Sequence, residues 1–163
     1  MSALVIGIDP GLGGALALLT SDGALVDLDD MPVLADGAAG RRAINAPLLA
    51  ARVRAWGAGQ AFCELVGPRP GEGAVGAFGF GRSRGIIEGT LGTLGVPVVM
   101  LAPAWWKRRV DIGPGADRKD EARSKAIARW PAMADKFARK RDDGRAEAAL
   151  IGAAGLQREA AGR

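Results

Sequence analysis

The fold is decided by residues 4–19, LVIGIDPGLGGALALL. Valine, isoleucine and leucine on both sides of a Pro-Gly and Gly-Gly segment are typical of two buried strands joined by a tight reversal. Asp9 stands at the end of the first strand. A carboxylate there is costly to remove from water unless it is paired, hydrogen-bonded or bound to a metal ion. Asp9 is therefore either a turn cap, as aspartate often is, or a functional group.

The composition limits the class of protein. The chain has 163 residues, a net charge of +4 and 48% hydrophobic residues, which predicts one globular domain over residues 1–163 with a substantial core. No apolar run is long enough to span a bilayer, and no signal peptide is visible. The single cysteine, Cys63, suits a reducing compartment, so we expect a cytoplasmic protein. The basic charge favours a polyanionic partner.

The residue types that are missing exclude several mechanisms. The chain has no histidine, no tyrosine and one cysteine. Ser-His and Cys-His triads, histidine-ligated metals, thiolate zinc sites and tyrosine nucleophiles are therefore excluded. Carboxylates, lysines and a hard cation with oxygen ligands, such as Mg²⁺ or Mn²⁺, remain available to an enzyme.

The rest of the pattern predicts an α/β fold. Short apolar runs predict further strands at residues 24–28, 61–66 and 96–101. Helical spacing and helix breakers predict helices at residues 47–56, 74–94, 102–109, 117–130 and 143–156, and a loop at 29–46. The first three strands should form an antiparallel meander. A helix between strands implies a crossover, so the later strands should run parallel to the first.

Four carboxylates occupy informative places in this pattern. Asp9 and Glu64 would lie near the C-terminal ends of neighbouring parallel strands, where open α/β sheets place their ligands. Asp143 and Glu147 are four residues apart and share one helical face at the rim of the core. Asp142 is expected to cap the start of that helix.

Glycines recur on one face of the helix at 74–94, at Gly81, Gly85, Gly89 and Gly92. Each costs about 1 kcal/mol relative to alanine, so we expect the smooth face to pack against another helix or a partner subunit. A phosphate-binding loop is disfavoured because no Lys-Ser or Lys-Thr follows it.

Basic residues outnumber acidic ones between Lys107 and Arg145. Such a segment is either a surface that follows nucleic-acid phosphates or an ordinary solvated helix face. Arg41 and Arg42, in the 29–46 segment, present the same two alternatives.

The ordered set of these features resembles the RuvC-like Holliday junction resolvases of the RNase H-like superfamily, especially those of phages and prophages. The resemblance is carried by residues 7–11, 64–66, 80–85, 103–109 and 143–150. It implies an RNase H-like α/β fold with a mixed five-stranded sheet, a three-strand antiparallel meander plus parallel strands, flanked by helices. It also implies a homodimeric crossover junction endodeoxyribonuclease that cuts four-way DNA junctions by symmetric paired nicks.

The resemblance also implies roles for individual residues. The catalytic, metal-binding carboxylates would be Asp9, Glu64, Asp143 and Glu147. They would bind two Mg²⁺ ions, which Mn²⁺ could replace. Lys119 would be catalytic, stabilising charge on the scissile phosphate. The DNA-binding residues would be Lys107, Arg108, Arg118, Lys119, Arg69 and Arg82. The helix face from Gly81 to Gly92 would form the dimer interface. No nucleotide cofactor and no membrane association are expected.

The chain departs from the family pattern at its last acidic position. Glu147 stands where many relatives carry aspartate, and it follows Asp143 by four residues rather than three. The choice of ligands among Asp142, Asp143 and Glu147 therefore stays open.

The substrate is less closely defined than the site. The loop after Glu64 lacks the aromatic wedge of some bacterial members; Arg69 and the pair Phe78 and Phe80 are the local substitutes. The alternatives are a related RNase H-like nuclease for branched, flap or RNA–DNA hybrid substrates and a non-catalytic junction-binding protein. An ATP-binding actin-like fold also begins with Asp-x-Gly, but it normally needs two such domains.

Overall fold

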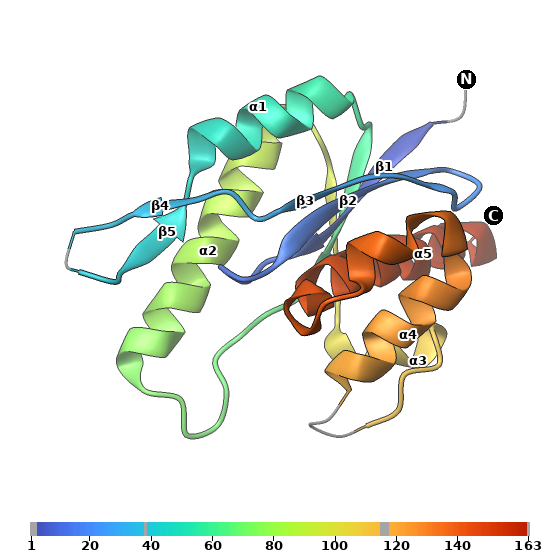
Figure 1. Cartoon of the computed structure of the whole chain (residues 1–163). Coiled ribbons are helices and arrows are strands. Elements are labelled where there is room, and N and C mark those ends of the chain that lie inside the picture. Colours follow the sequence, from blue (N-terminus) through green and yellow to red (C-terminus); the bar gives the residue numbers. More distant parts are fainter. Residues whose placement is uncertain (1–2, 38, 115–117, 163) are drawn as a thin grey trace.

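A mixed five-stranded sheet forms the centre of the molecule in the computed structural model, which describes residues 3–37, 39–114 and 118–162, with only the backbone of Lys119. In sheet order its strands are β3 (Leu25–Asp30), β2 (Ala15–Thr20), β1 (Leu4–Asp9), β6 (Gln60–Glu64) and β7 (Val98–Leu101) (Figure 1). β1, β2 and β3 form an antiparallel meander, and β6 and β7 run parallel to β1. The expected α/β architecture is confirmed.

Helices cover both faces of the sheet (Figure 1). One face packs against α1 (Ala46–Trp56) and α2 (Ala74–Thr93). The other packs against α5 (Asp143–Ala161), α3 (Pro103–Arg109) and α4 (Lys119–Arg129). Two 3₁₀ turns, η1 (Pro131–Phe137) and η2 (Lys140–Asp142), connect α4 to α5. None of the helices in the described part of the chain is long and apolar enough to cross a bilayer.

The alternation of side chains along β1 and β6 decides which face receives the carboxylates. Val5 belongs to the buried cluster beneath α5, whereas Ile6 belongs to the cluster beneath α1 and α2. Successive strand residues point to opposite faces, so Asp9, which is in phase with Val5, faces α5. On β6, Phe62 packs in the α5 cluster, and Glu64 follows it by two residues. Both strand-end carboxylates therefore lie on the α5 side.

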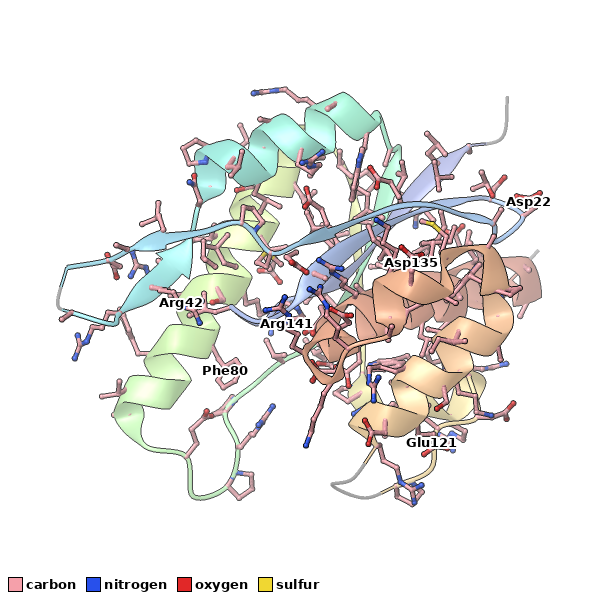
Figure 2. The ribbon with its side chains drawn as sticks, in the orientation of Figure 1. Asp22, Arg42, Phe80, Glu121, Asp135 and Arg141 are labelled. Atoms are coloured by element: carbon pink, nitrogen blue, oxygen red, sulfur yellow. The ribbon has the colours of Figure 1, made fainter. Side chains whose placement is uncertain are left out.

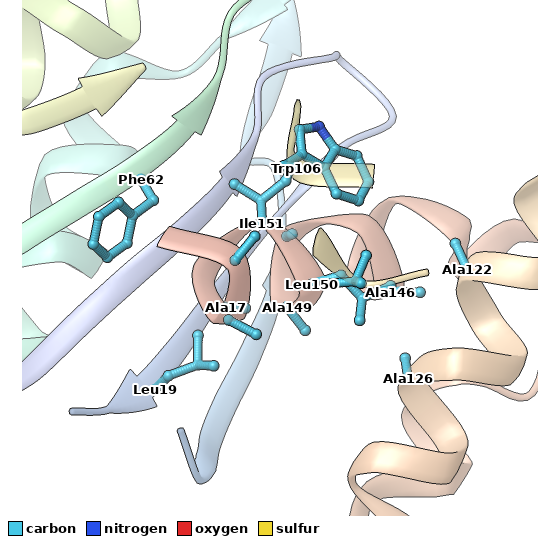
Figure 3. Close-up of a cluster of buried hydrophobic side chains, with 14 of the residues drawn as sticks. Ala17, Leu19, Phe62, Trp106, Ala122, Ala126, Ala146, Ala149, Leu150 and Ile151 are labelled. Atoms are coloured by element: carbon cyan, nitrogen blue, oxygen red, sulfur yellow. The ribbon is translucent and has the colours of Figure 1, made fainter. Parts of the chain in front are cut away.

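Buried hydrophobic side chains pack between α5 and the sheet (Figure 3), and glycines allow the two backbones to come close together. A Cβ at Gly7 would lie closer than 3.0 Å to the carbonyl oxygen of Ala148, and one at Gly155 equally close to the ring of Phe62. Real Cβ atoms essentially never approach so closely. Helix and sheet backbones therefore approach more closely here than any larger residue would allow.

Residues 29–46 differ from the expected loop. They contain β4 (Val33–Ala35) and β5 (Arg42–Ile44), which pair as a separate two-stranded antiparallel sheet. Its anchor is Ile44, which is buried in the cluster beneath α1 and α2. Strands of three residues are too short to show a clear alternation of apolar and polar residues, so the sequence pattern did not predict this hairpin.

The boundaries of two other elements also differ from expectation. The strand expected to end at residue 66 ends at Glu64, which makes this carboxylate the last residue of β6. The helix expected from Asp117 begins at Lys119, and Asp117 itself lies outside the described residues.

Candidate active site

The turn between β1 and β2 holds Asp9 at the edge of the sheet. The backbone N–H of Gly14 donates to the carbonyl oxygen of Gly11 (2.9 Å), and the N–H of Gly11 makes a long hydrogen bond to Asp9 Oδ1 (3.4 Å). A Cβ at Gly14 would lie closer than 3.0 Å to the carbonyl oxygen of Asp9. Glycine at this position is therefore required for the tight reversal that ends β1 at the carboxylate.

The first turn of α5 packs onto the same turn. A Cβ at Gly144 would lie 2.5 Å from the carbonyl oxygen of Gly13 and 3.3 Å from Asp9 Oδ2. This close approach needs a glycine at the start of the helix. It brings the helical turn that carries Asp143 and Glu147 to Asp9.

The electrostatics of Asp9 reflect this crowding. The pKa of Asp9 is raised to about 7, first by burial and then by the carboxylates of Glu147, Glu64 and Asp143, against a lowering by the Gly11 N–H. Burial disfavours the ionised carboxylate and the neighbouring carboxylates repel it, so a positive charge beside Asp9 would favour its ionised form. The functional role of Asp9 stays a prediction, and its raised pKa is compatible with that role.

Glu64 is held by a residue on α3. The indole Nε1 of Trp106 donates to Glu64 Oε1 at 3.0 Å, and Trp106 is completely buried. Trp106 lies in the 103–109 segment, whose sequence pattern did not predict a role in orienting a carboxylate. The sequence signal for this contact is a tryptophan, which has an N–H donor, shortly after β7. The last residue of β7, Leu101, pairs with Glu64.

A cavity of about 530 Å³ opens at the C-terminal ends of β1 and β6. Its charged lining residues are Asp9, Glu64, Glu147, Arg69, Lys107 and Arg118. All six are among the predicted site residues. Carboxylates and cationic side chains that line one cavity form a site that suits a phosphodiester together with hard cations.

The donor set fits divalent metal ions of this kind. All four candidate ligands are carboxylates, and oxygen ligands suit Mg²⁺ and Mn²⁺. The raised pKa of Asp9 indicates negative charge that a bound cation would offset. Across the residues that the structure describes, no three acidic, cysteine or histidine side chains already stand together as a metal cluster.

Asp142 belongs to a different environment from its neighbours. Its carboxylate is 2% exposed and accepts hydrogen bonds from the backbone N–H (2.9 Å) and guanidinium (2.8 Å) of Arg139. These bonds lower its pKa. Asp142 stands just before α5 but caps the 3₁₀ turn η2, not the helix. Glu147 lines the active-site cavity, whereas Asp142 does not.

The structure brings some of the predicted basic residues to the cavity and leaves others away from it. Arg108 lines a neighbouring cavity beside Lys107. Arg82 pairs with Asp36 and is not part of the active-site lining. Lys119 is the first residue of α4, but its side chain lies outside the described part of the chain. The roles of these residues stay predictions.

The two phenylalanines near the cavity have different surroundings. Phe80 lines the cavity, and the guanidinium of Arg69 lies 5.1 Å from its ring centre (Figure 2 labels Phe80). Phe78, two residues earlier on α2, is 73% exposed. Phe80 therefore belongs to the site wall, and Phe78 projects into solvent.

The structure of the chain resembles those of known proteins, although its sequence matches none of the families or curated proteins compared. No family model and no curated protein matches the chain. RuvC of Thermus thermophilus in complex with a Holliday junction substrate matches with a TM-score of 0.63 and 15% identity, over 96% of each chain. A second structure of Thermus thermophilus RuvC matches with a TM-score of 0.56 and 17% identity, also over 96% of each chain. The chain therefore has the RNase H-like α/β fold of RuvC.

Proposed function

We propose that the protein is a metal-dependent endodeoxyribonuclease that resolves four-way DNA junctions by symmetric paired nicks. The observation that carries this proposal is the cavity in which Asp9, Glu64 and Glu147 lie with cationic side chains at the C-terminal ends of two parallel strands. The fold of a RuvC bound to a Holliday junction supports the choice of substrate. That this protein comes from a phage or prophage stays a prediction.

The carboxylates would hold the metal ions. Glu147, Glu64 and Asp143 all act electrostatically on Asp9 and raise its pKa, and we assign two Mg²⁺ ions to these four carboxylates. When bound, such ions polarise a phosphoryl oxygen and stabilise the attacking and leaving oxygens of an in-line displacement. The indole of Trp106 holds one oxygen of Glu64 and so fixes the direction of the other.

The cations of the cavity would bind the substrate. Lys107, Arg118 and Arg69 line the same cavity as the carboxylates. Guanidinium groups bind phosphate oxygens in pairs, and an ammonium binds them as a point charge. These side chains would hold the scissile phosphodiester over the carboxylates and stabilise negative charge that develops during its hydrolysis. Lys119 is proposed for the same task on the resemblance alone.

A homodimer through α2 is part of the proposal. The four glycines at 81, 85, 89 and 92 are exposed, and a Cβ at any of them would meet no atom within 4 Å. Packing within the described part of the chain therefore does not require glycine on this face. Pairing of two such faces about a two-fold axis would give one active site for each nicked strand. Light scattering after size exclusion would measure the mass, and a monomer at assay concentration would contradict this part.

The experiment that tests the function compares a labelled four-way junction with a linear duplex of the same sequence, with Mg²⁺ and with chelator. Paired symmetric nicks in the junction alone, only with metal, are expected. Asp9→Asn should abolish cutting and leave junction binding intact, because it removes one ligand and one charge. Junction binding without cutting would instead indicate a binding protein. Equal cutting of flaps or hybrids would keep the nuclease and change its substrate.

A further inference from the structure

A second cavity, of about 490 Å³, is lined by residues 12–14 of the β1–β2 turn, next to Gly11 of the candidate active site. We call it the arginine pocket. Its charged lining residues are Arg42, Arg139, Arg141, Arg145, Asp30 and Asp142. They come from β3, β5, η2 with the residue before it, and α5, so only the folded chain assembles them. Four arginines against two aspartates leave the pocket with an excess of positive charge.

Two of the four arginines are committed to the aspartates. Arg145 binds Asp30 with two parallel hydrogen bonds, Nε to Oδ1 at 2.6 Å and Nη2 to Oδ2 at 2.8 Å. Arg139 binds the buried carboxylate of Asp142. These pairs fix η2 and the start of α5 and offset both negative charges in the pocket.

The other two arginines of the pocket, Arg42 and Arg141, are not paired with either aspartate. In the part of the chain that the structure describes, neither Arg42 nor Arg141 has an ion pair, side-chain hydrogen bond or ring contact, and both are exposed (Figure 2). They reach one cavity from different elements, the β4–β5 hairpin and η2. Two guanidinium groups that line one cavity and are not paired with a carboxylate are suited to anionic oxygens, which they bind with paired N–H donors.

The β1–β2 turn contributes residues to both cavities, including Leu12 in the arginine pocket. Gly11 lines the active-site cavity, and Gly13 and Gly14 line the arginine pocket. A Cβ at Gly13 would meet no atom within 4 Å, so packing does not account for glycine there. An exposed glycine permits the close approach of another backbone. A strand that leaves the active site along this turn would arrive at Arg42 and Arg141.

We propose that the arginine pocket binds backbone phosphates of the same DNA molecule whose scissile phosphate lies in the active site, on the part of the strand that continues across the β1–β2 turn. The inference rests on the proposed function. The pocket contributes affinity and register and takes no part in the chemistry. Phosphate is favoured over an acidic protein segment because the pocket is lined by the same β1–β2 turn as a site that itself suits a phosphodiester.

The test is binding of a fluorescent four-way junction in chelator, followed by anisotropy across a range of salt concentrations. Arg42→Gln/Arg141→Gln should lower affinity by roughly 10- to 50-fold at about 0.1 M salt, and the slope of log K against log salt should fall by about 1.8, since each lost phosphate contact lowers it by about 0.9. Each single variant should give about half of the slope change. Circular dichroism and thermal unfolding should match the wild type, because both side chains are exposed.

The matched control is Arg41→Gln/Lys140→Gln. It removes the same charge one residue away from each pocket arginine, at side chains that do not line the pocket. Arg41 acts electrostatically on Asp36, and Lys140 on Asp120, away from the pocket residues. The control should change affinity by less than about 3-fold, as expected for charges without a phosphate contact.

The outcomes separate this inference from the proposed function, because cleavage by the wild type is measured in parallel with Mg²⁺. If the wild type cuts junctions and the pocket variant binds like the control, the inference is overturned and the nuclease stands. If the wild type binds without cutting and the pocket variant loses affinity, the pocket stands and the nuclease fails. If the wild type binds no DNA, both are overturned.

Discussion

Asp9→Asn should make the metal-free protein more stable. Burial and three neighbouring carboxylates raise the pKa of Asp9 from its ordinary value of 3.8 to about 7. Holding this group ionised in the folded state at neutral pH therefore costs free energy that the unfolded state does not incur. The shift is about 3 pKa units, and each unit corresponds to about 1.36 kcal/mol, so the penalty above pH 7 is at most about 4 kcal/mol. Asparagine has nearly the same shape and no charge to remove from water.

The assay is thermal unfolding of wild type and Asp9→Asn in EDTA, at pH 7.5 and at pH 5. For a domain of this size about 1 kcal/mol shifts the midpoint by about 2–4 °C, so the variant should unfold up to roughly 16 °C higher at pH 7.5. The sign with pH follows from proton binding. Between about pH 4 and 7 the folded state binds the extra proton, so Asp9 lowers stability progressively as pH rises. At pH 5 the difference should shrink to under roughly 2 kcal/mol.

The control for this experiment is Asp135→Asn, which removes one carboxylate on η1, outside the cavity lining. It should leave the midpoint almost unchanged at both pH values. Mg²⁺ should raise the midpoint of the wild type and not that of Asp9→Asn. An Asp9→Asn protein that unfolds at or below the wild-type temperature in EDTA at pH 7.5 would refute the reasoning, since it would show that the native surroundings favour the ionised group.

Three further sets of substitutions test how the site is supported. Trp106→Phe removes the indole N–H that donates to Glu64 and should lower the free energy of unfolding by about 1.5–3 kcal/mol. Cleavage should fall more than junction binding, and equal losses in both would contradict an orienting role. Arg139→Gln leaves the nearly buried carboxylate of Asp142 with the backbone N–H of residue 139 and the more distant Arg145 contact at 3.8 Å, and it should lower stability because the guanidinium donor is lost. Because Arg139 lowers the pKa of Asp142, this loss should be full at neutral pH and diminish as pH falls below about 4, as urea unfolding at several pH values would show. Gly155→Ala places a Cβ against the ring of Phe62 and should lower the free energy of unfolding by about 1–3 kcal/mol or more. Gly81→Ala places a Cβ in open space on a helix and should stabilise the monomer by about 0.5–1 kcal/mol. Thermal unfolding of both variants tests these two expectations.

The strand-end carboxylates were predictable because they depend on local rules. Apolar runs broken by Pro-Gly and Gly-Gly fix β1 and β2, and the crossover helix makes β6 parallel to β1. Since side chains alternate along a strand, the positions of Asp9 and Glu64 then follow from the ends of their strands. Composition alone also limits the chemistry, because a chain without histidine leaves carboxylates as the metal ligands.

The parts that could not be predicted depend on contacts between distant segments. Trp106 and Glu64 are 42 residues apart, and their hydrogen bond depends on how α3 packs after β7. The arginine pocket combines Arg42 with residues near the start of α5, through a hairpin whose strands are too short for a periodic signal. No spacing in the sequence encodes either arrangement, because each is set by packing of the folded chain.

The choice among the acidic residues before α5 shows how one position changes a carboxylate's role. Asp142 and Asp143 are adjacent, but successive residues at a helix start point about 100° apart. Asp142 faces Arg139 and Arg145, which offset its charge and lower its pKa. Asp143 and Glu147 instead act on Asp9 and raise its pKa. In this short segment the carboxylate of Asp142 is paired with arginines and holds the backbone, whereas those of Asp143 and Glu147 act on the site around Asp9, which favours a cation. This difference favours Asp143 and Glu147 over Asp142 as the proposed ligands.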